Sequence, residues 1–310
     1  MCMSPTSDRA GVEPFLGLAY LAVLVPTWAR QVDADPEQVP DLLEALVVVA
    51  LASGSFAATK RGLAFADSDN TGDIAVADGT QVSWVYNWGS TAPSYLKNTD
   101  MTYIPMQWGE DNADNFMAEV QAQNAKTILG FNEPDLSSQS DITPMTAASL
   151  WVQYIQPLKA HGVRLGSPAV SSAPSGIPWL SQFFGNCTEC TFDFIPIHWY
   201  GDGLDNFKDY VESFYDKFSS PVWVTEFAST SSSVNEVEDF CTDAIAFLDG
   251  QNWIEGYAWF ALYRQESGSY YSKRIPSSVV SQYDLSITTD LLDVNGQPNT
   301  LGDIYLHGTN

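Results

Sequence analysis

The stretch Thr127–Asp135 reads TILGFNEPD, and it indicates what kind of fold the chain adopts. It begins as an apolar run that is long enough for a buried strand and too short for a helix. Pro134 cannot continue a central strand, because its nitrogen has no hydrogen to donate to a neighbouring strand. We therefore expect a strand that ends at Asn132 and Glu133. In parallel α/β folds, functional side chains gather at the carboxyl ends of the strands.

The same kind of run recurs from Lys60 onward, and Gly, Pro, Asn, Asp or Ser bounds each one. The eight predicted strands are Gly62–Phe65, Val82–Tyr86, Tyr103–Gln107, Thr127–Phe131, Arg164–Gly166, Phe192–Ile197, Val222–Thr225 and Gly256–Phe260. The helix-like segments between them are Asn112–Asn124, Met145–His161, Phe207–Phe218 and Glu236–Asp249.

Eight strand–helix units over about 210 residues are typical of an α/β fold of the (β/α)8, or TIM-barrel, kind. The connection from Ser167 to Cys190 looks loop-like, so we expect some short or missing helices. The alternative is an open, doubly wound sheet. That fold usually carries a glycine-rich phosphate loop after its first strand, whereas here the first strand runs into Ala66–Asn70 without one.

Residues 1–58 differ from the rest of the chain. Their two apolar runs, Phe15–Val25 and Leu42–Ala52, are each as long as a signal-peptide core and too short to span a bilayer. Small residues follow the second run, as at a cleavage site. We expect a secretory leader that ends near Ala58, with residues 59–310 forming a single domain outside the cell or in the cell wall. The alternative is a pair of amphipathic helices packed on that domain.

Acidic residues outnumber basic ones by 38 to 13, which gives a net charge of -25. Such a chain repels phosphate backbones and anionic lipid heads, so nucleic acid and membranes are not expected as partners. The charge suits a secreted protein with a neutral substrate, and a monomer is the default state for such a protein.

The four cysteines are Cys2, Cys187, Cys190 and Cys241. A zinc site needs four ligands, usually from two close pairs, and the CTEC pair at 187–190 has no second pair. We therefore expect no metal and no cofactor. Cys187 and Cys190 are disulfide candidates; free thiols, or pairing of Cys241 with one of them, stay open. Asn186 begins the single glycosylation sequon and is a candidate for modification.

A second carboxylate stands in the stretch Pro221–Ala228, PVWVTEFA. Glu226 comes at the carboxyl end of the predicted seventh strand, as Glu133 does for the fourth. Strands four and seven lie across the mouth of a barrel, so both side chains project into one cleft. Two carboxylates across a cleft are the minimum machinery for glycoside hydrolysis. Proximity separates their pKa values, so one stays protonated while the other is ionised. The alternative is two solvated loop glutamates.

The pairing of Asn132–Glu133 with Glu226 resembles the clan A glycoside hydrolases. That resemblance implies a retaining mechanism with Glu133 as acid/base and Glu226 as nucleophile. More narrowly, the motifs GFNEPD, DFIPIHWYG, VWVTEFA, GYAWFALY and LLDVNGQPNTLGDIY resemble glycoside hydrolase family 128, over about Lys60 to Tyr305. This family implies a β-1,3-glucanase, and the chain looks most similar to fungal, endo-acting members.

Other residues at the predicted strand ends suit a sugar site. Asn132 is expected to bind the sugar 2-hydroxyl. Tyr200, at the end of strand six, is expected to hydrogen-bond Glu226, and His198 beside it is either a site residue or a core histidine. Trp259 is expected to form the floor of the -1 subsite, with a core tryptophan as the alternative.

Further aromatic and amide side chains follow strands two, three and eight. Sugar C–H faces stack on aromatic rings, while amides take the hydroxyls. The predicted substrate track contains Tyr86, Trp88, Gln107, Trp108 and Tyr263. The leading hypothesis is a secreted hydrolase of β-1,3-glucan, a neutral polysaccharide. The alternatives are the same chemistry on another β-glucan or a mannan, and a barrel that binds glucan without cleaving it.

Overall fold

The computed structural model describes residues 60–67, 69–265 and 289–308. The chain divides into two units, Met1–Ser55 and Phe56–Asn310, and the described residues all belong to the second. The predicted leader, residues 1–58, lies outside the described residues. The fold and the candidate site therefore concern the second unit.

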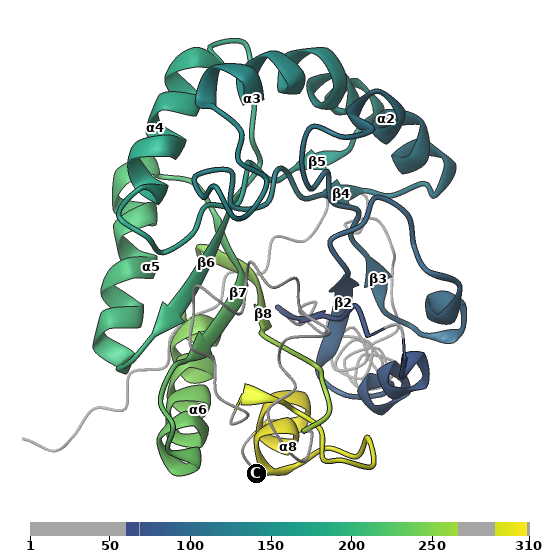
Figure 1. The fold of residues 1–310 in the computed structure, drawn as a ribbon, viewed down its shortest axis with the longest axis vertical. Coiled ribbons are helices and arrows are strands. Elements are labelled where there is room, and N and C mark those ends of the chain that lie inside the picture. Colours follow the sequence, from purple (N-terminus) through teal and green to yellow (C-terminus); the bar gives the residue numbers. More distant parts are fainter. Residues whose placement is uncertain (1–59, 68, 266–288, 309–310) are drawn as a thin grey trace, which may run out of the picture. The chain divides into compact units, whose positions relative to one another are not determined.

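Eight parallel strands in the described residues form the centre of this unit (Figure 1). They are β1 (Arg61–Ala64), β2 (Val82–Tyr86), β3 (Thr102–Tyr103), β4 (Thr127–Ile128), β5 (Arg164–Leu165), β6 (Ile195–Gly201), β7 (Val222–Ser229) and β8 (Ile254–Trp259). Parallel strands are covered on both faces, which explains their nearly continuous apolar runs. All of β7 is buried.

The strands close into a barrel. Six of them pair in the order β3-β2-β1-β8-β7-β6, and β4 pairs with β5. Single parallel bridges join these two groups, between Met106 and Leu129 on one side and between Gly166 and Phe194 on the other. The predicted (β/α)8 barrel is thus confirmed, and the carboxyl ends of β4 and β7 lie on opposite sides of its mouth.

Helices follow the strands around the outside (Figure 1). They are α2 (Ala113–Ala122), α3 (Pro144–Leu150), α4 (Gly176–Asn186), α5 (Leu204–Phe218), α6 (Val234–Gly250) and α8 (Thr300–His307). The connections after β1 and β2 instead contain the short 3-10 helices η3 (Thr71–Ala77) and η4 (Ser94–Asn98). After α3 the chain continues as a π-helical turn, η5 (Trp151–Ile155), and a 3-10 helix, η6 (Gln156–His161).

Helix α4 corrects the expectation that Ser167–Cys190 is only a loop. Trp179, Leu180 and Phe183 are its buried apolar residues, and the spacing of Trp179 and Phe183 by four places them on one helical face. The preceding Ser, Ala, Pro and Gly residues make the segment look like a loop in the sequence, although proline is well tolerated in a first helical turn. Tertiary packing of the aromatic face determines the helix.

The lower part of the barrel is filled by stacked aromatic rings. The ring of Trp223 lies 4.4 Å from that of Phe194 and 5.0 Å from that of Trp84. Glycine makes this possible at Gly256, where an added Cβ would stand 2.7 Å from the Trp223 ring. This solid layer supports the strand ends above it, where the polar side chains gather.

Helix α8 supplies hydrogen bonds to the first and last strands of the barrel, β1 and β8, which pair with each other. The Tyr305 hydroxyl donates to the Gly62 carbonyl on β1 at 2.7 Å and accepts from the Trp259 backbone N–H on β8 at 3.1 Å. Arg61 donates in turn to the Tyr305 carbonyl at 2.8 Å. The Tyr305 side chain thus adds hydrogen bonds to both strands where β1 pairs with β8.

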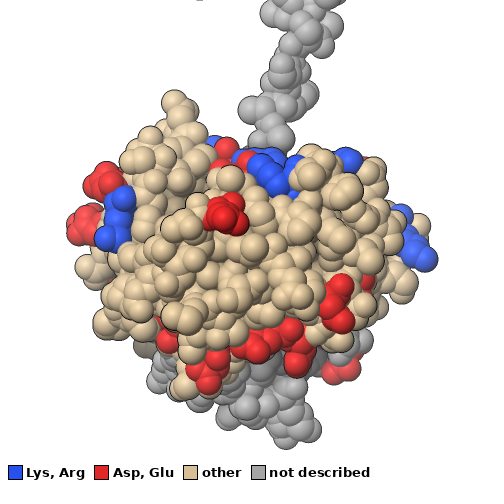
Figure 2. Space-filling model, turned by 90° about the horizontal axis from the view of Figure 1, so that it is seen from above, with Lys and Arg blue, Asp and Glu red and all other residues tan. Residues whose placement is uncertain are grey.

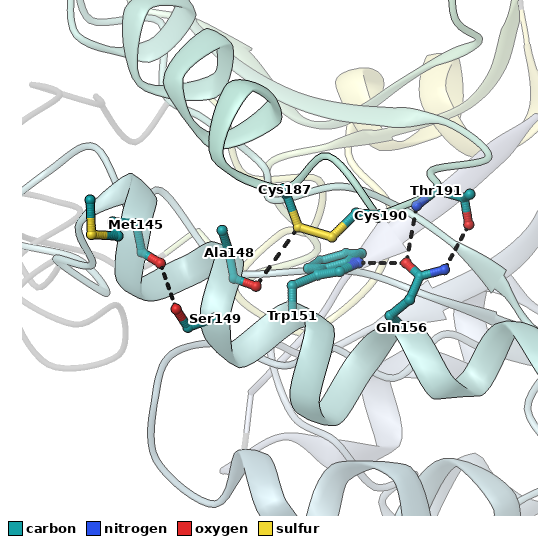
Figure 3. The surroundings of a disulfide bond; sticks show 8 residues. All are labelled: Met145, Ala148, Ser149, Trp151, Gln156, Cys187, Cys190 and Thr191. Atoms are coloured by element: carbon teal, nitrogen blue, oxygen red, sulfur yellow. Dashed lines mark hydrogen bonds between the residues drawn. A yellow bond between two sulfur atoms is a disulfide. The ribbon is translucent and has the colours of Figure 1, made fainter.

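Cys187 and Cys190 form a disulfide at the end of α4 (Figure 3). Beside it, the Trp151 indole donates to the Gln156 side chain at 3.2 Å, and the Gln156 amide donates to the Thr191 hydroxyl at 2.9 Å. Cys241 is a buried free thiol. Asn186, the glycosylation candidate, is exposed, and its modification stays a prediction.

Uncharged side chains predominate on the face that Figure 2 shows, and acidic residues gather along its lower margin. Among the described residues, none of the helices has the length and apolar character needed to cross a membrane.

Candidate active site

The chain after β4 holds two polar side chains at the barrel mouth. The Asn132 N–H donates to the Trp108 carbonyl at 2.9 Å, and the Glu133 N–H donates to the Ala169 carbonyl at 2.7 Å. Glu133 has a φ of 40°, in the left-handed region that non-glycine residues rarely adopt. Pro134, which has no N–H to donate, follows. This turn breaks the usual alternation of side chains and directs the Glu133 carboxyl group toward β6 and β7.

Three donors surround the carboxylate of Glu226. Trp88 donates its indole N–H to Oε1 at 2.7 Å, and the Tyr86 hydroxyl donates to the same oxygen at 3.2 Å. The Tyr200 hydroxyl donates to Oε2 at 2.6 Å. An indole N–H can only donate, so Glu226 accepts that bond as a carboxylate does. Hydrogen bonds to a charged acceptor are the strong ones, and they fix its orientation.

His198 stands between the two glutamates. Its Nδ1 lies 2.9 Å from Oε1 of Glu133 and 3.5 Å from Oε2 of Glu226. The pairing of β6 with β7 places His198 beside Glu226, because these two residues are partners across the strands. One ring nitrogen thus connects the carboxyl groups of β4 and β7.

Burial and charge act on the protonation of this cluster. Glu133 is 1% exposed, and burial raises the pKa of its carboxyl group. The hydrogen bond from His198 opposes that rise, while the charges of Glu226 and Asp135 add to it. The pKa of His198 is raised as well: burial alone lowers it, but the charge of Glu226 and the hydrogen bond with Glu133 outweigh burial.

The two tyrosines near Glu226 remain protonated donors. Burial raises the pKa of Tyr86 and of Tyr200 well above the usual range, and the charge of Glu226 raises both further. A neutral phenol can donate, whereas a phenolate cannot. Both hydroxyls are therefore protonated near neutral pH and can donate to Glu226.

Glu133, His198 and Glu226 each offer one ligand atom, and these three atoms all lie within 4.8 Å of one another. A cation could use such donors, but the oxygens of Glu226 already accept from Trp88 and Tyr200. The arrangement places one buried acid of raised pKa beside one carboxylate surrounded by hydrogen-bond donors, which suits acid/base chemistry next to a fixed carboxylate better than metal binding.

Residues 62–305 match the family model described as the glycosyl hydrolase catalytic core. The chain belongs to this family. Among curated proteins, the alkali-sensitive linkage protein 1 of Schizosaccharomyces pombe is 38% identical over 213 residues. That match covers 65% of this chain and 38% of the relative, so it spans less than half of the relative's length.

Solved structures of glycoside hydrolase family 128 share the fold. An endo-β-1,3-glucanase of subgroup IV from Lentinula edodes is 27% identical with a TM-score of 0.69, over 80% of this chain and 100% of that one. An exo-β-1,3-glucanase of subgroup VI from Aureobasidium namibiae is 27% identical with a TM-score of 0.68, over 82% and 98%. The resemblance to family 128 is confirmed, and the protein is a glycoside hydrolase.

In this glycoside hydrolase, most of the predicted site residues come together. Hydrogen bonds join Tyr86, Trp88, Tyr200 and Glu226 into one group, and His198 links that group to Glu133. Tyr263, expected on the substrate track, is largely buried, and Glu226 is among the charges that raise its pKa.

Two of the predicted track residues have supporting positions instead. Tyr86 is fully buried and contacts Glu226. Gln107 is buried and donates its amide to the carbonyls of Gly109 and Asp111, at 2.7 and 2.9 Å, so it shapes the loop after β3. Trp108 is 39% exposed, so part of its side chain is accessible at the surface.

Trp259 corrects the expectation of a subsite floor. Its ring is fully buried against Phe227 and Phe240, on the side of the sheet that faces α6. Neighbouring residues of a strand point to opposite faces. The next residue, Phe260, therefore takes the site position, with its ring 5.9 Å from Trp88 and 5.5 Å from Tyr200.

Sequence reasoning missed two polar residues in the loop after Glu133. Asp135 accepts from the Ser171 N–H and hydroxyl, at 3.0 and 2.6 Å, and so joins the loops after β4 and β5. Gln139 accepts from the Asn132 side chain at 3.3 Å. Asp135 belongs to the motif GFNEPD, so its place in that motif was a usable signal; Gln139 stands in an ordinary polar loop.

Proposed function

We propose that this glycoside hydrolase cleaves β-1,3-glucan with retention of configuration, using Glu133 as acid/base and Glu226 as nucleophile. The observation that carries the proposal is a pair of buried carboxyl groups at the ends of β4 and β7. One oxygen of Glu133 lies within 4.8 Å of one oxygen of Glu226, and the two groups have different hydrogen-bond partners. Those surroundings suit one group to hold a proton and the other to hold a charge.

Glu133 suits the acid/base role. Burial raises the pKa of its carboxyl group, so the group keeps its proton to a higher pH than an ordinary glutamate does. The protonated group donates to the glycosidic oxygen as the bond breaks. When Glu226 becomes an uncharged ester, one cause of the raised pKa of Glu133 disappears, and Glu133 can then act as base toward a water.

Glu226 suits the nucleophile role. Its carboxylate accepts bonds from Tyr86, Trp88 and Tyr200, which stabilise its charge and hold it in one orientation. A nucleophile needs a fixed approach to the anomeric carbon, since correct orientation alone supplies a large part of the rate.

The spacing of the carboxyl groups supports retention. Retaining glycosidases hold their two carboxyl groups about 5–5.5 Å apart, whereas inverting ones leave about 6.5–9.5 Å for a water. Oxygens of Glu133 and Glu226 within 4.8 Å of each other belong with the shorter spacing.

The substrate class rests on the relatives and on the site's character. The two solved relatives described above are β-1,3-glucanases, one endo-acting and one exo-acting. The exposed ring of Trp108 and the half-buried ring of Trp88 offer stacking faces for sugars. A net charge of -25 disfavours an anionic polysaccharide.

Residues 59–310 would form the catalytic domain, and the leader would carry it out of the cell to the wall. Localisation of the full chain with a tag after Asn310 tests this part of the proposal separately from the chemistry.

The chemistry is tested by incubating laminarin with wild type, Glu226→Gln and Glu133→Gln, with the exposed Glu189→Gln as the matched control. We expect wild type and Glu189→Gln to release short β-1,3 oligosaccharides whose first-formed anomer by proton NMR is β. Both site variants should lose most activity while keeping their melting temperature.

Three results would contradict parts of the proposal. A first-formed α anomer would exclude retention, and full activity of Glu226→Gln would remove that residue from catalysis. Tight binding of insoluble glucan by wild type, without any release of sugar from laminarin or from other β-glucans and mannans, would identify a binding protein instead.

A further inference from the structure

Gln139 is a buried polar residue in a loop that is partly exposed. It lies in the connection from Pro134 to Thr143, and it is 8% exposed although the adjacent Ser137 and Ser138 are exposed. The loop folds back on the end of β4: the Ser140 hydroxyl donates to the Asn132 carbonyl at 2.7 Å. This fold places the Gln139 side chain against that of Asn132.

The two side-chain amides make one hydrogen bond with each other. Asn132 Nδ2 donates to Gln139 Oε1 at 3.3 Å. The remaining atoms, Asn132 Oδ1 and Gln139 Nε2, are buried and have no hydrogen-bond partner among the described residues. Buried polar atoms are nearly always paired in folded proteins, so unpaired atoms on two amides that are hydrogen-bonded to each other indicate a group that completes them.

One unpaired acceptor and one unpaired donor match a hydroxyl group, which donates one hydrogen bond and accepts another. The match does not depend on how the amides are turned. If both amides rotated by half a turn, Gln139 would donate to Asn132, and one donor and one acceptor would again remain. A carboxylate, by contrast, offers only acceptors, and an ammonium only donors.

Asn132 is already expected to bind the 2-hydroxyl of the sugar residue whose bond is cleaved; we propose that Gln139 is a second residue of this contact, so that the two amides form one receptor. This inference rests on the proposed function, because Asn132 directly precedes the proposed acid/base Glu133. Gln139 has two parts in the receptor: it orients the Asn132 amide, and its own free amide atom contacts the same hydroxyl. Bonds to this hydroxyl strengthen in the transition state of glycoside hydrolysis.

The test compares two aryl β-1,3-glucobiosides that differ only in the 2-hydroxyl of the sugar carrying the aryl group. For each protein the readout is the ratio of kcat/KM for the hydroxyl substrate to that for its 2-deoxy analogue. The variants are Gln139→Met, which keeps the length and removes the hydrogen bonds, Asn132→Ala and the double variant. Ser137→Ala, an exposed position in the same loop, is the matched control.

We expect wild type and Ser137→Ala to favour the hydroxyl substrate strongly. Gln139→Met should lower the ratio by about 10- to 100-fold, the usual size for a lost hydrogen bond in a transition state, while its activity on the 2-deoxy substrate changes little. The double variant should be no worse than Asn132→Ala alone, because the two amides act as one unit.

An unchanged ratio in Gln139→Met, or an equal loss on both substrates, would overturn the receptor and leave Gln139 as a loop support. If Gln139→Met does not fold, Gln139→Ala takes its place with the same expectation, and a wild-type ratio near one would exclude a receptor for this hydroxyl altogether. The proposed function fails separately, through full activity of Glu226→Gln. An inactive Glu226→Gln with a wild-type ratio in Gln139→Met would overturn only the present inference.

Discussion

The imidazole Nδ1 of His198 lies 2.9 Å from Oε1 of Glu133, and both residues are buried. A histidine in this position can hold the proposed acid/base group in place and also adjust its protonation. The same nitrogen lies 3.5 Å from Glu226. His198 therefore contacts both carboxyl groups, and it acts on the pKa of Glu133 in addition to the direct effect of the Glu226 charge.

Replacing His198 should move the alkaline limb of activity. Burial raises the pKa of Glu133, and the His198 hydrogen bond and charge lower it. His198→Leu removes the lowering contribution, so the pKa of Glu133 should rise further. Because the acid must be protonated, the alkaline limb of the kcat/KM profile should move to higher pH.

The control for this prediction is His198→Asn, whose amide can occupy the place of Nδ1 and donate without carrying a charge. Its alkaline limb should move less than that of His198→Leu. An alkaline limb that stays in place, or moves to lower pH, in His198→Leu would show that His198 does not act on Glu133.

Tyr200→Phe should slow the second half of the reaction more than the first. Glu226 departs as a carboxylate when the glycosyl-enzyme is hydrolysed, and the variant lacks one of the donors that stabilise that charge. A hydrogen bond to a charged group contributes about 1.5–3 kcal/mol, so kcat should fall by about 10- to 100-fold. Stopped-flow measurements with an activated aryl glucoside should reveal a burst of aryl release.

Tyr215→Phe, at a more exposed tyrosine on α5, serves as the control and should show wild-type kinetics. A fall in kcat/KM as large as that in kcat, without a burst, would mean that the Tyr200 hydroxyl serves the first step instead.

Glu133→Ala should show an activity that depends strongly on the leaving group. Hydrolysis of laminarin needs a proton on the departing oxygen, and its loss should reduce the rate by about 10²- to 10⁴-fold. A dinitrophenyl glucoside leaves without a proton, so its kcat/KM should stay near that of wild type. Azide should raise kcat and give a β-glycosyl azide, because azide attacks without a base. Equal losses on both substrates would contradict the acid/base role.

Gly130→Ala should destabilise the domain although it adds only a methyl group. The new Cβ would stand 2.8 Å from the Trp151 ring and 2.8 Å from the Pro168 nitrogen, within the buried layer under Asn132. Overpacking of this kind costs about 1–3 kcal/mol, which denaturant unfolding measures directly. Gly185→Ala is the control. It lies within α4 with open space around it, and alanine favours a helix, so stability should stay equal or rise.

The sequence predicts the barrel well because parallel strands leave a clear mark. A strand buried on both faces reads as a short apolar run between turn residues, and β2 was predicted with its observed bounds, Val82–Tyr86. The predicted strand at Phe192–Ile197 instead begins at Ile195 and continues to Gly201. Its later part, HWYG, mixes polar and aromatic residues because it belongs to the site, and functional residues interrupt the apolar pattern.

The two glutamates could be found from the sequence because each follows a strong strand signal. The sequence could not show in which direction the side chains next to the site point. Whether Trp259 or Phe260 faces the mouth depends on a shift of one residue in the strand, which turns every side chain to the other face. The role of Trp88 was likewise hidden, since its indole reaches Glu226 from a left-handed backbone conformation with a φ of 60°.

The pairing of β1 with β8, to which Tyr305 adds hydrogen bonds, has a consequence for the synthesis of this domain. Gly62 pairs with Ala258, and the Tyr305 hydroxyl donates to the Gly62 carbonyl. Chains emerge from the ribosome in order, so β1 waits through the synthesis of nearly the whole barrel with one edge unpaired. Contacts between distant parts of a chain form slowly, and unpaired strand edges attract other chains. During synthesis, the first strand is thus the part of the domain that depends longest on protection from aggregation.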